Sequence, residues 1–286
     1  MLRPPNGVET MAKARQTNRQ EAGGEIRGCK VVKAANKRPQ LFVYDEIGPA
    51  WAGMVDAIDI VAALDEIGSD QDFDLRINSP GGVCDIGAAI YNLLREHEGS
   101  ITVKVDGIAA SAASIVMMAG DEIEIAANAR VMIHEAWTFM AGNKRAFEKE
   151  CAVLQGYDDA AIETYVARTG GDQKQITAWL EAETWFNADE AIEHGFADRK
   201  TSAAKNISLR VPKGRYKNAP KDCEEYEQTI EASIELAPPP MRPAATTSRR
   251  RGKSDESSAE APEQSSGRSP GALRARVAAA RARAGV

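Results

Sequence analysis

Short apolar runs with a two-residue period alternate along this chain with segments whose apolar residues recur about every 3.6 positions. The strand-like runs are LFVYDEI (41–47), FDLRIN (73–78), TVKVD (102–106), EIEIA (122–126) and RVMIH (130–134). The helical segments among them are 54–64, 86–94 and 111–119. This alternation is typical of βαβ units, so we predict an α/β fold with a mostly parallel sheet.

Three further helices are predicted beyond the last of these strands. The first covers 144–168, where one apolar stripe is formed by Phe147, Cys151, Leu154, Ala161, Ile162 and Tyr165. Such an amphipathic helix needs a partner surface for its stripe. We expect Asp172 to cap the next helix, and the NADE sequence of Asn187–Glu190 predicts a capping box that opens a helix ending at Gly195.

The two ends of the chain differ in composition from its middle. Residues 1–28 mix Arg, Lys, Pro, Gly and Gln without periodicity, and we expect a flexible arm. Residues 29–218 are expected to form one domain, because the chain has enough apolar residues for one sizeable core. Residues 219–286 begin with an acidic, helical-looking stretch and continue as Pro-rich and Ser/Glu/Arg-rich sequence. We expect a largely disordered tail that ends in a short basic helix.

Charge and cysteine content exclude several classes of protein. Residues 242–286 hold ten Lys/Arg and four Asp/Glu, a balance of +6, which leaves −12 for the rest of a chain whose total is −6. An acidic body is a poor ligand for nucleic acid, so we expect none to bind the main domain. The four scattered cysteines have no metal-ligand spacing and predict reduced thiols and no metal site; they are Cys29, Cys84, Cys151 and Cys223.

No apolar run approaches the roughly 18 residues that a membrane span requires. The first 25 residues also lack the apolar stretch of a signal peptide. We therefore expect a soluble protein of the cytoplasm without a membrane partner.

The sequence GIAASAAS (107–114) places Ser111 between a strand-like segment and an apolar helical one. The small neighbouring alanines permit a tight turn and the approach of a substrate carbonyl. The N–H of Ala112, at a helix N-terminus, could then stabilise a developing oxyanion. The structural alternative is that Ser111 is only an N-cap. Ser114 is expected to pack inside the helix.

His134 ends the strand-like run RVMIH, where open α/β folds place ligands. A neutral imidazole there could accept the Ser111 proton and pass it to a leaving amine. The alternative is a hydrogen-bonded structural histidine. We expect His97 to be exposed among charged neighbours and His194 to cap a helix C-terminus.

The sequence INSPGG (77–82) supplies a glycine turn between a strand and a helix. Gly81 and Gly82 suit either a tight turn or a close approach of backbone to ligand. The phosphate-binding patterns GxGxxG and GxxxxGK[ST] are absent from the chain, so binding of ATP or a dinucleotide by those routes is not expected.

Four motifs together resemble one family, the proteolytic subunit of the Clp protease (ClpP), and especially its phage and prophage relatives, the head maturation proteases. INSPGG, GIAASAAS, RVMIH and WFNADEAIEHGFAD occur in family order, and Gly82 and Ser111 keep the family spacing of 29 positions. The resemblance covers residues 41–200. It implies the ClpP/crotonase-type fold of repeated βαβ units with a protruding handle helix.

The resemblance also implies the site residues of a serine peptidase. Ser111 would be the nucleophile and His134 the general base and acid. The backbone N–H groups of Gly82 and Ala112 would form the oxyanion hole. In the family an aspartate orients the histidine, and the matching position here is Glu183, which reaches one methylene further and can still accept the imidazole N–H.

Asp172 and Asp189 are the alternatives for this third position, and Asp189 is also expected in the first turn of its helix. The resemblance implies no cofactor.

The resemblance further implies a homo-oligomeric ring, with rings stacked in pairs through the handle helix around a chamber. We expect an ATP-independent serine endopeptidase acting on protein or peptide substrates, among them phage capsid or scaffold proteins during prohead maturation. It would work in the bacterial host cytoplasm or inside the prohead, and a host unfoldase ATPase is a further candidate partner. The alternatives are a crotonase-type acyl-CoA enzyme and a non-catalytic assembly scaffold with the same fold.

Overall fold

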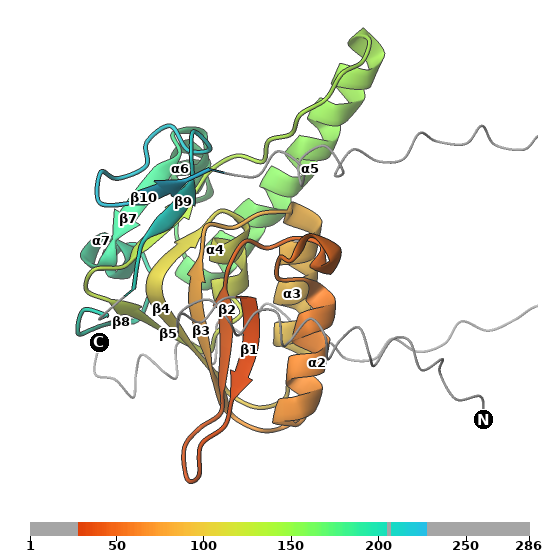
Figure 1. Ribbon diagram of the computed structural model, residues 1–286. Coiled ribbons are helices and arrows are strands. Elements are labelled where there is room, and N and C mark those ends of the chain that lie inside the picture. Colours follow the sequence, from red (N-terminus) through yellow and green to blue (C-terminus); the bar gives the residue numbers. More distant parts are fainter. Residues whose placement is uncertain (1–27, 205–206, 228–286) are drawn as a thin grey trace, which may run out of the picture.

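The computed structural model of the chain describes residues 28–204 and 207–227 (Figure 1). The arm expected over residues 1–28 lies outside the described residues except for Gly28. The expected tail lies outside them beyond residue 227, including its terminal basic helix.

Eight strands form one sheet, in the order β1-β2-β3-β4-β5-β8, and β6 joins it by pairing with both β4 and β7. The strands are β1 (Gly28–Val32), β2 (Gln40–Tyr44), β3 (Phe73–Ser79), β4 (Ile101–Ala110), β5 (Glu122–Ala126), β6 (Arg130–Ile133), β7 (Thr184–Asn187) and β8 (Arg199–Thr201). All pairs are parallel except β1 with β2 and β6 with β7. The predicted α/β fold with a mostly parallel sheet is confirmed.

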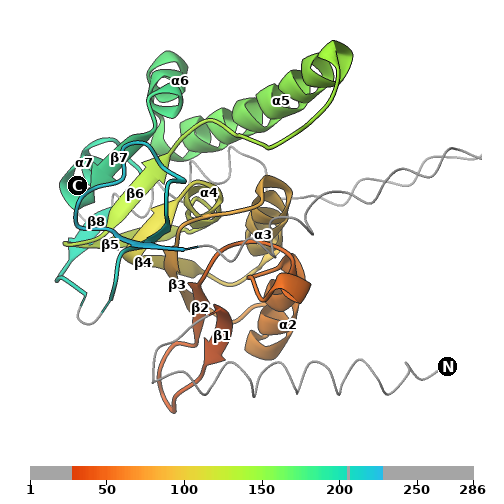
Figure 2. The same ribbon diagram turned by 45° about the horizontal axis from the view of Figure 1, so that its top comes forward.

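The described chain contains six α-helices and one short 3-10 helix. They are η1 (Ala50–Ala52), α2 (Ala57–Ile67), α3 (Cys84–Glu96), α4 (Ala112–Met117), α5 (Lys144–Thr169), α6 (Gln173–Glu181) and α7 (Ala188–Glu193). Helices α2 and α3 lie side by side against one face of the sheet (Figures 1 and 2). The core under them is built from alternate strand residues such as Leu75, Val103 and Ile123, which are fully buried.

Strand β4 changes its neighbour along its length. Thr102–Val105 pairs with β5, whereas Ile108–Ala110 pairs with β6. Strand β6 is thereby brought to the carboxyl end of β4. This is the edge at which open α/β sheets bind ligands.

Local capping determines where several helices begin. Asp56 forms a capping box with Asp59, so α2 begins at Ala57 rather than at the expected residue 54. The predicted cap at Asp172 is confirmed, as is the capping box of Asn187 with Glu190. His194 occupies the C-cap position of α7, as predicted.

The long helix α5 projects from the body of the molecule (Figures 1 and 2). Only its carboxyl half enters the core, where Ile162 and Tyr165 are buried. In its amino half Phe147 is 46 % exposed and Cys151 is exposed. Within the described residues, the predicted apolar stripe is therefore not covered by other parts of the chain along the first turns of α5.

His97 is buried, so the prediction that it is exposed was wrong. The residue is only 5 % exposed and lies at the carboxyl end of α3. Its Nε2 lies 2.9 Å from the carbonyl oxygen of Gln71, and its ring packs edge-on against Phe73. Charged neighbours in sequence misled the prediction, because tertiary packing turned this side chain inward.

Residues 207–227, which we call the C-terminal strap, form a second small sheet of β9 (Arg210–Pro212) and β10 (Glu224–Tyr226), paired in parallel. The folded part of the chain thus continues past the domain end expected at residue 218. The acidic stretch expected to be helical contains β10 instead. Its Tyr226 hydroxyl donates to the Glu46 carboxylate, which anchors this segment to the main domain.

Candidate active site

Ser111 lies where β4 ends and α4 begins. Its backbone N–H donates to the carbonyl oxygen of Met132 on β6, at 2.9 Å. Because side chains alternate along a strand, His134 two positions further projects from the same side as Met132. The parallel pairing of β4 with β6 therefore brings residues 111 and 134 together.

The backbone of Ser111 is strained, with φ 54° and ψ −126°. Within the described chain only three residues other than glycine have positive φ, and two of them, Ser111 and Glu183, lie in this site. Such strain concentrates at functional positions. Ser111 holds the N-cap position of α4, yet its side chain makes no capping hydrogen bond, so the simple N-cap alternative is not supported.

The Ser111 side chain is directed at His134 instead, with 2.8 Å between Oγ and Nε2. Behind it the Ser114 hydroxyl donates to the Ser111 carbonyl oxygen and also hydrogen-bonds the Tyr165 hydroxyl, at 2.7 Å. Ser114 packs inside its helix, as predicted, and it ties the strained turn to α5.

Burial lowers the pKa of His134 to about 4. The negative charge of Glu183 opposes this shift, and the positive charge of Arg215 adds to it. The imidazole is therefore neutral near pH 7. A neutral ring at hydrogen-bond distance from a hydroxyl is able to accept its proton.

The glycine turn packs directly against the strained serine. A Cβ placed on Gly81 would lie 2.4 Å from the Ala110 carbonyl oxygen, and one on Gly82 would lie 1.8 Å from the Ile47 carbonyl oxygen. Both glycines also have positive φ, 87° and 149°. Close approach of backbone to backbone, beyond a simple turn, thus requires glycine at these positions.

Two backbone N–H groups near Ser111 remain available for a ligand. The Gly81 carbonyl accepts from Ile47 N–H, and in a trans peptide the following Gly82 N–H points the opposite way. Ala112 is the first residue of α4, so its N–H has no carbonyl partner within the helix. The structure places Gly82 and Ala112 on the two segments that meet at Ser111.

Glu183 lies beside His134 because of the β6–β7 register. Ile133 pairs with Thr184 in this antiparallel ladder, which makes Glu183 and His134 the next opposed positions. The Glu183 carboxylate nevertheless accepts hydrogen bonds from the backbone N–H groups of Lys217 and Asn218, at 2.9 and 2.7 Å.

No hydrogen bond joins His134 to a carboxylate within the described residues. The hydrogen bond expected between Glu183 and the imidazole is thus not formed, and the partners of this carboxylate include two backbone N–H groups of the strap. The alternatives lie elsewhere: Asp172 caps α6, and Asp189 pairs with Lys200 at 2.6 Å.

Tyr216 and Arg215 belong to the site, and sequence reasoning missed both. The Tyr216 ring packs edge-on against His134 with 5.5 Å between ring centroids, and Arg215 contributes its charge. They occur in the sequence KGRYKNAP, which has no motif or periodicity that would have marked them.

The described residues hold no group of three or more His, Cys, Asp or Glu side chains that could bind a metal ion. Over the same residues, no helix is both long enough and apolar enough to cross a membrane.

Comparison with known proteins agrees with this geometry. Three relatives are named as proteolytic subunits of an ATP-dependent Clp protease. That of Deinococcus radiodurans is 28 % identical over 138 residues, which cover 48 % of this chain and 68 % of the relative. Subunit 2 of Tropheryma whipplei is 30 % identical over 45 % of this chain and 72 % of the relative, and subunit 2 of Nocardia farcinica is 32 % identical over 47 % and 67 %.

The model of the Clp protease family matches residues 22–202, a span that includes every strand from β1 to β8 and the Ser111–His134 pair. The chain therefore belongs to the Clp protease family.

Proposed function

We propose that this protein is a serine endopeptidase with Ser111 as nucleophile and His134 as general base. The observation that carries the proposal is the 2.8 Å contact between Ser111 Oγ and His134 Nε2 at a strained strand-to-helix turn. A half-buried hydroxyl as the attacking group, a neutral base within hydrogen-bond distance and nearby backbone donors are the parts that acyl transfer needs.

The proposed reaction proceeds in two steps. Ser111 Oγ attacks the peptide carbonyl carbon while His134 Nε2 takes the hydroxyl proton, and the carbonyl oxygen becomes an oxyanion held by the Gly82 and Ala112 N–H groups. The C–N bond then breaks as His134 returns the proton to the leaving amine. Water, deprotonated by His134, hydrolyses the resulting acyl-serine and regenerates the Ser111 hydroxyl.

We assign Glu183 the place of the third residue, acting through its charge. Its carboxylate raises the proton affinity of His134 against the effect of burial. Because the described carboxylate is hydrogen-bonded to the strap, it stabilises the imidazolium electrostatically rather than by accepting its N–H.

Labelling with a fluorophosphonate probe tests the proposed function. We expect wild-type protein to be modified at Ser111, as located by peptide mass spectrometry, and Ser111→Ala to remain unmodified. Ser100→Ala is the matched control, since this serine directly precedes β4, at the opposite end of the strand from Ser111, and it should keep a labelled Ser111. Absence of labelling, together with binding of coenzyme A, would instead favour the crotonase-type alternative. Absence of both would favour a non-catalytic scaffold.

The handle supports a proposal about assembly. Large apolar side chains gather on the amino half of α5 and on the segment before it, where Trp137 is 47 %, Phe139 is 89 % and Phe147 is 46 % exposed. Exposed apolar groups of this size are typical of association surfaces. We propose that they join copies of the chain into a homo-oligomeric ring or a pair of stacked rings, which sedimentation analysis of Phe139→Ser would test.

The substrate proposal rests on the resemblance to head maturation proteases. We propose phage capsid or scaffold proteins as substrates and cleavage without ATP, in the host cytoplasm or the prohead. A host unfoldase ATPase would then be dispensable. Incubation of capsid and scaffold proteins encoded beside this gene with wild type and Ser111→Ala, with and without ATP, would test each part. Cleavage only with ATP and an added unfoldase would contradict ATP independence.

A further inference from the structure

We propose that Tyr216 of the C-terminal strap is a positioning residue of the active site, which holds the glycine turn through its hydroxyl and the His134 imidazole through its ring. This inference rests on the proposed peptidase function. The strap lies beyond residues 22–202, the part of the chain that the family model matches.

The Tyr216 hydroxyl donates to the Pro80 carbonyl oxygen. The N–H of the same peptide unit, that of Gly81, donates to Ser79 Oγ at 3.1 Å. Both polar groups of the peptide before Gly81–Gly82 are therefore held. That peptide directly precedes the Gly81–Gly82 peptide, so it helps to fix the position of the proposed oxyanion donor, whose direction is also set by the bond from Ile47 N–H to the Gly81 carbonyl.

The Tyr216 ring restrains His134 from a different direction. The two rings meet at 84° with centroids 5.5 Å apart, and Trp185 packs on Tyr216 at 5.6 Å and 79°. Edge-to-face pairs of this kind favour one orientation. Since no carboxylate hydrogen-bonds His134 within the described residues, ring packing takes over part of the orienting role that an acid has in a serine triad.

Tyr216 is held firmly enough to act in this way. It is 6 % exposed and belongs to a small apolar cluster with the last residues of β4 and the middle of β6, among them Ala110 and Met132, which lead into Ser111 and His134. The preceding residue, Arg215, forms an ion pair with Glu46 at 2.8 Å. The next two residues donate their N–H groups to Glu183.

The same arrangement accounts for the electrostatics around His134. Its neighbours include one negative group, Glu183, one positive group, Arg215, the Ser111 hydroxyl and the Tyr216 ring. Burial is the main cause of the lowered pKa, and the Tyr216 ring packs directly against the imidazole. Removal of the ring would admit water and raise the His134 pKa toward its ordinary value.

Two variants of the full chain separate the two contacts. Tyr216→Phe removes the hydroxyl and keeps the ring, whereas Tyr216→Ala removes both. Tyr44→Phe is the matched control, because it deletes a buried hydroxyl that donates to Asp106. The rate of fluorophosphonate labelling is measured against pH, and His134 is titrated by NMR of ¹³C-labelled histidine, with assignment by His134→Gln among only three histidines.

We expect Tyr216→Phe to label about 10-fold more slowly with an unchanged His134 titration, since the turn alone is loosened. Tyr216→Ala is expected to label about 100-fold more slowly, with the His134 pKa moved upward. Tyr44→Phe should label at the wild-type rate. Addition of phenol to Tyr216→Ala should restore part of the rate if the ring itself is what is missing.

Wild-type labelling rate and wild-type His134 titration in Tyr216→Ala would overturn the inference. If Tyr216→Ala does not fold, Tyr216→Phe carries the test. An unchanged labelling rate in Tyr216→Phe would exclude a role for the hydroxyl contact. A changed His134 titration in Tyr216→Phe would show that the ring alone does not set the environment of His134. If wild type itself fails to label, the proposed function fails. The NMR titration then still reports whether Tyr216 sets the environment of His134.

Discussion

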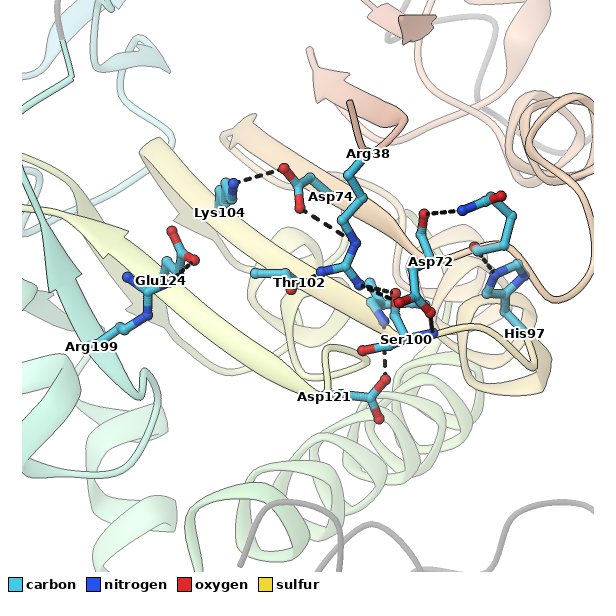
Figure 3. Close-up of polar contacts among 12 residues, drawn as sticks. Arg38, Asp72, Asp74, His97, Ser100, Thr102, Lys104, Asp121, Glu124 and Arg199 are labelled. Atoms are coloured by element: carbon cyan, nitrogen blue, oxygen red, sulfur yellow. Dashed lines mark hydrogen bonds and ion pairs between the residues drawn. The ribbon is translucent and has the colours of Figure 1, made fainter. Parts of the chain in front are cut away.

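Polar groups at the amino ends of the parallel strands have different hydrogen-bond partners from those at the carboxyl ends. At the amino ends side chains bond backbone groups of neighbouring segments: Asp72 accepts from Ser100 N–H, Asp121 accepts from Ile101 N–H, and Arg38 donates to the Ser100 carbonyl (Figure 3). At the carboxyl ends, Ser111 is held at positive φ with its hydroxyl against an imidazole. The first arrangement satisfies backbone groups, whereas the second lies beside the Gly82 and Ala112 N–H groups that we propose as oxyanion donors.

The buried His97 and the half-buried His134 show what this difference means. His97 bonds a backbone carbonyl and packs on Phe73, and His134 bonds a hydroxyl and packs on Tyr216. Both rings therefore have one polar partner and one aromatic neighbour. The partner decides their chemistry, since a carbonyl has no proton to give and a hydroxyl has one.

Replacement of His134 should have the largest effect. We expect His134→Gln to lower kcat by on the order of 10⁴- to 10⁶-fold, because loss of one triad member removes nearly all concerted catalysis. Peptide hydrolysis and probe labelling would measure it. If His134→Gln keeps activity within 10-fold of wild type, His134 is not the general base, and it does not differ from His97 in its chemical role.

Adding a side chain to the glycine turn should have the second largest effect on activity. Gly82→Ala combines a positive φ with a clash against the Ile47 carbonyl, so we expect the turn to shift and kcat to fall by about 100- to 1000-fold, as for a lost oxyanion donor. Gly170→Ala is the matched control, since it also has positive φ but nothing within 4 Å of the new Cβ. It should cost about 1 kcal/mol of stability and no activity. Equal activity of both variants would exclude Gly82 as a donor.

Acidification should destabilise the folded protein through His134, which lies at the carboxyl ends of the strands. Because the folded His134 pKa is about 4 and the unfolded value is about 6.5, the unfolded chain binds more protons between these values. Stability should therefore fall as pH drops from about 6.5 to 4, by up to about 3 kcal/mol, and labelling should fall only near pH 4. Urea unfolding of wild type and His134→Gln across this range isolates the contribution, which should be absent from the variant.

Loss of the Glu183 charge should have a moderate effect. Glu183→Gln is expected to lower kcat about 10-fold, since the carboxylate acts through charge, far less than the roughly 10⁴-fold of an acid that fixes the histidine tautomer. Glu124→Gln, which changes an acid of β5 that pairs with Arg199 of β8, is the control. A 10⁴-fold loss would mean that Glu183 hydrogen-bonds His134 during turnover, and wild-type activity would remove Glu183 from the mechanism.

The smallest effect is expected at the amino ends of the strands. His97→Gln should leave labelling unchanged and lower stability by about 1–2 kcal/mol, because the buried contact with Gln71 is disturbed. Thermal unfolding with parallel labelling would check it. A loss of labelling in a folded variant would show that the two ends of the sheet are coupled.

Most of the fold could be predicted because its signals are local. Apolar alternation marked the strands from β2 to β6, and Asp172 and Asn187 were recognisable as caps. Strand β7, the sequence TWFN, was not predicted as a strand, since its four residues form β structure only by pairing with β6. Helix α2 begins later in the sequence than predicted, because the N-cap residue Asp56, rather than the periodicity of apolar residues, determines where it starts.

The pairing of Ser111 with His134 was predictable only in part. Each residue alone had an equally simple structural explanation, and only the order of four motifs favoured catalysis. The sequence of the C-terminal strap contains no motif that would have predicted its contact with the site. Tyr216 reaches His134 from 82 positions away, and neither periodicity nor a motif reports a contact of that range.

The order of residues by itself determined the parallel α/β class, the small side chains around Ser111 and the glycines that the turn requires, because these follow from hydrogen bonding and sterics between near neighbours. Tertiary structure alone decided that the His134 pKa is lowered, that Glu183 accepts hydrogen bonds from the strap and that Tyr216 packs against His134. Burial and long-range packing act through distances that the chain acquires only when it folds.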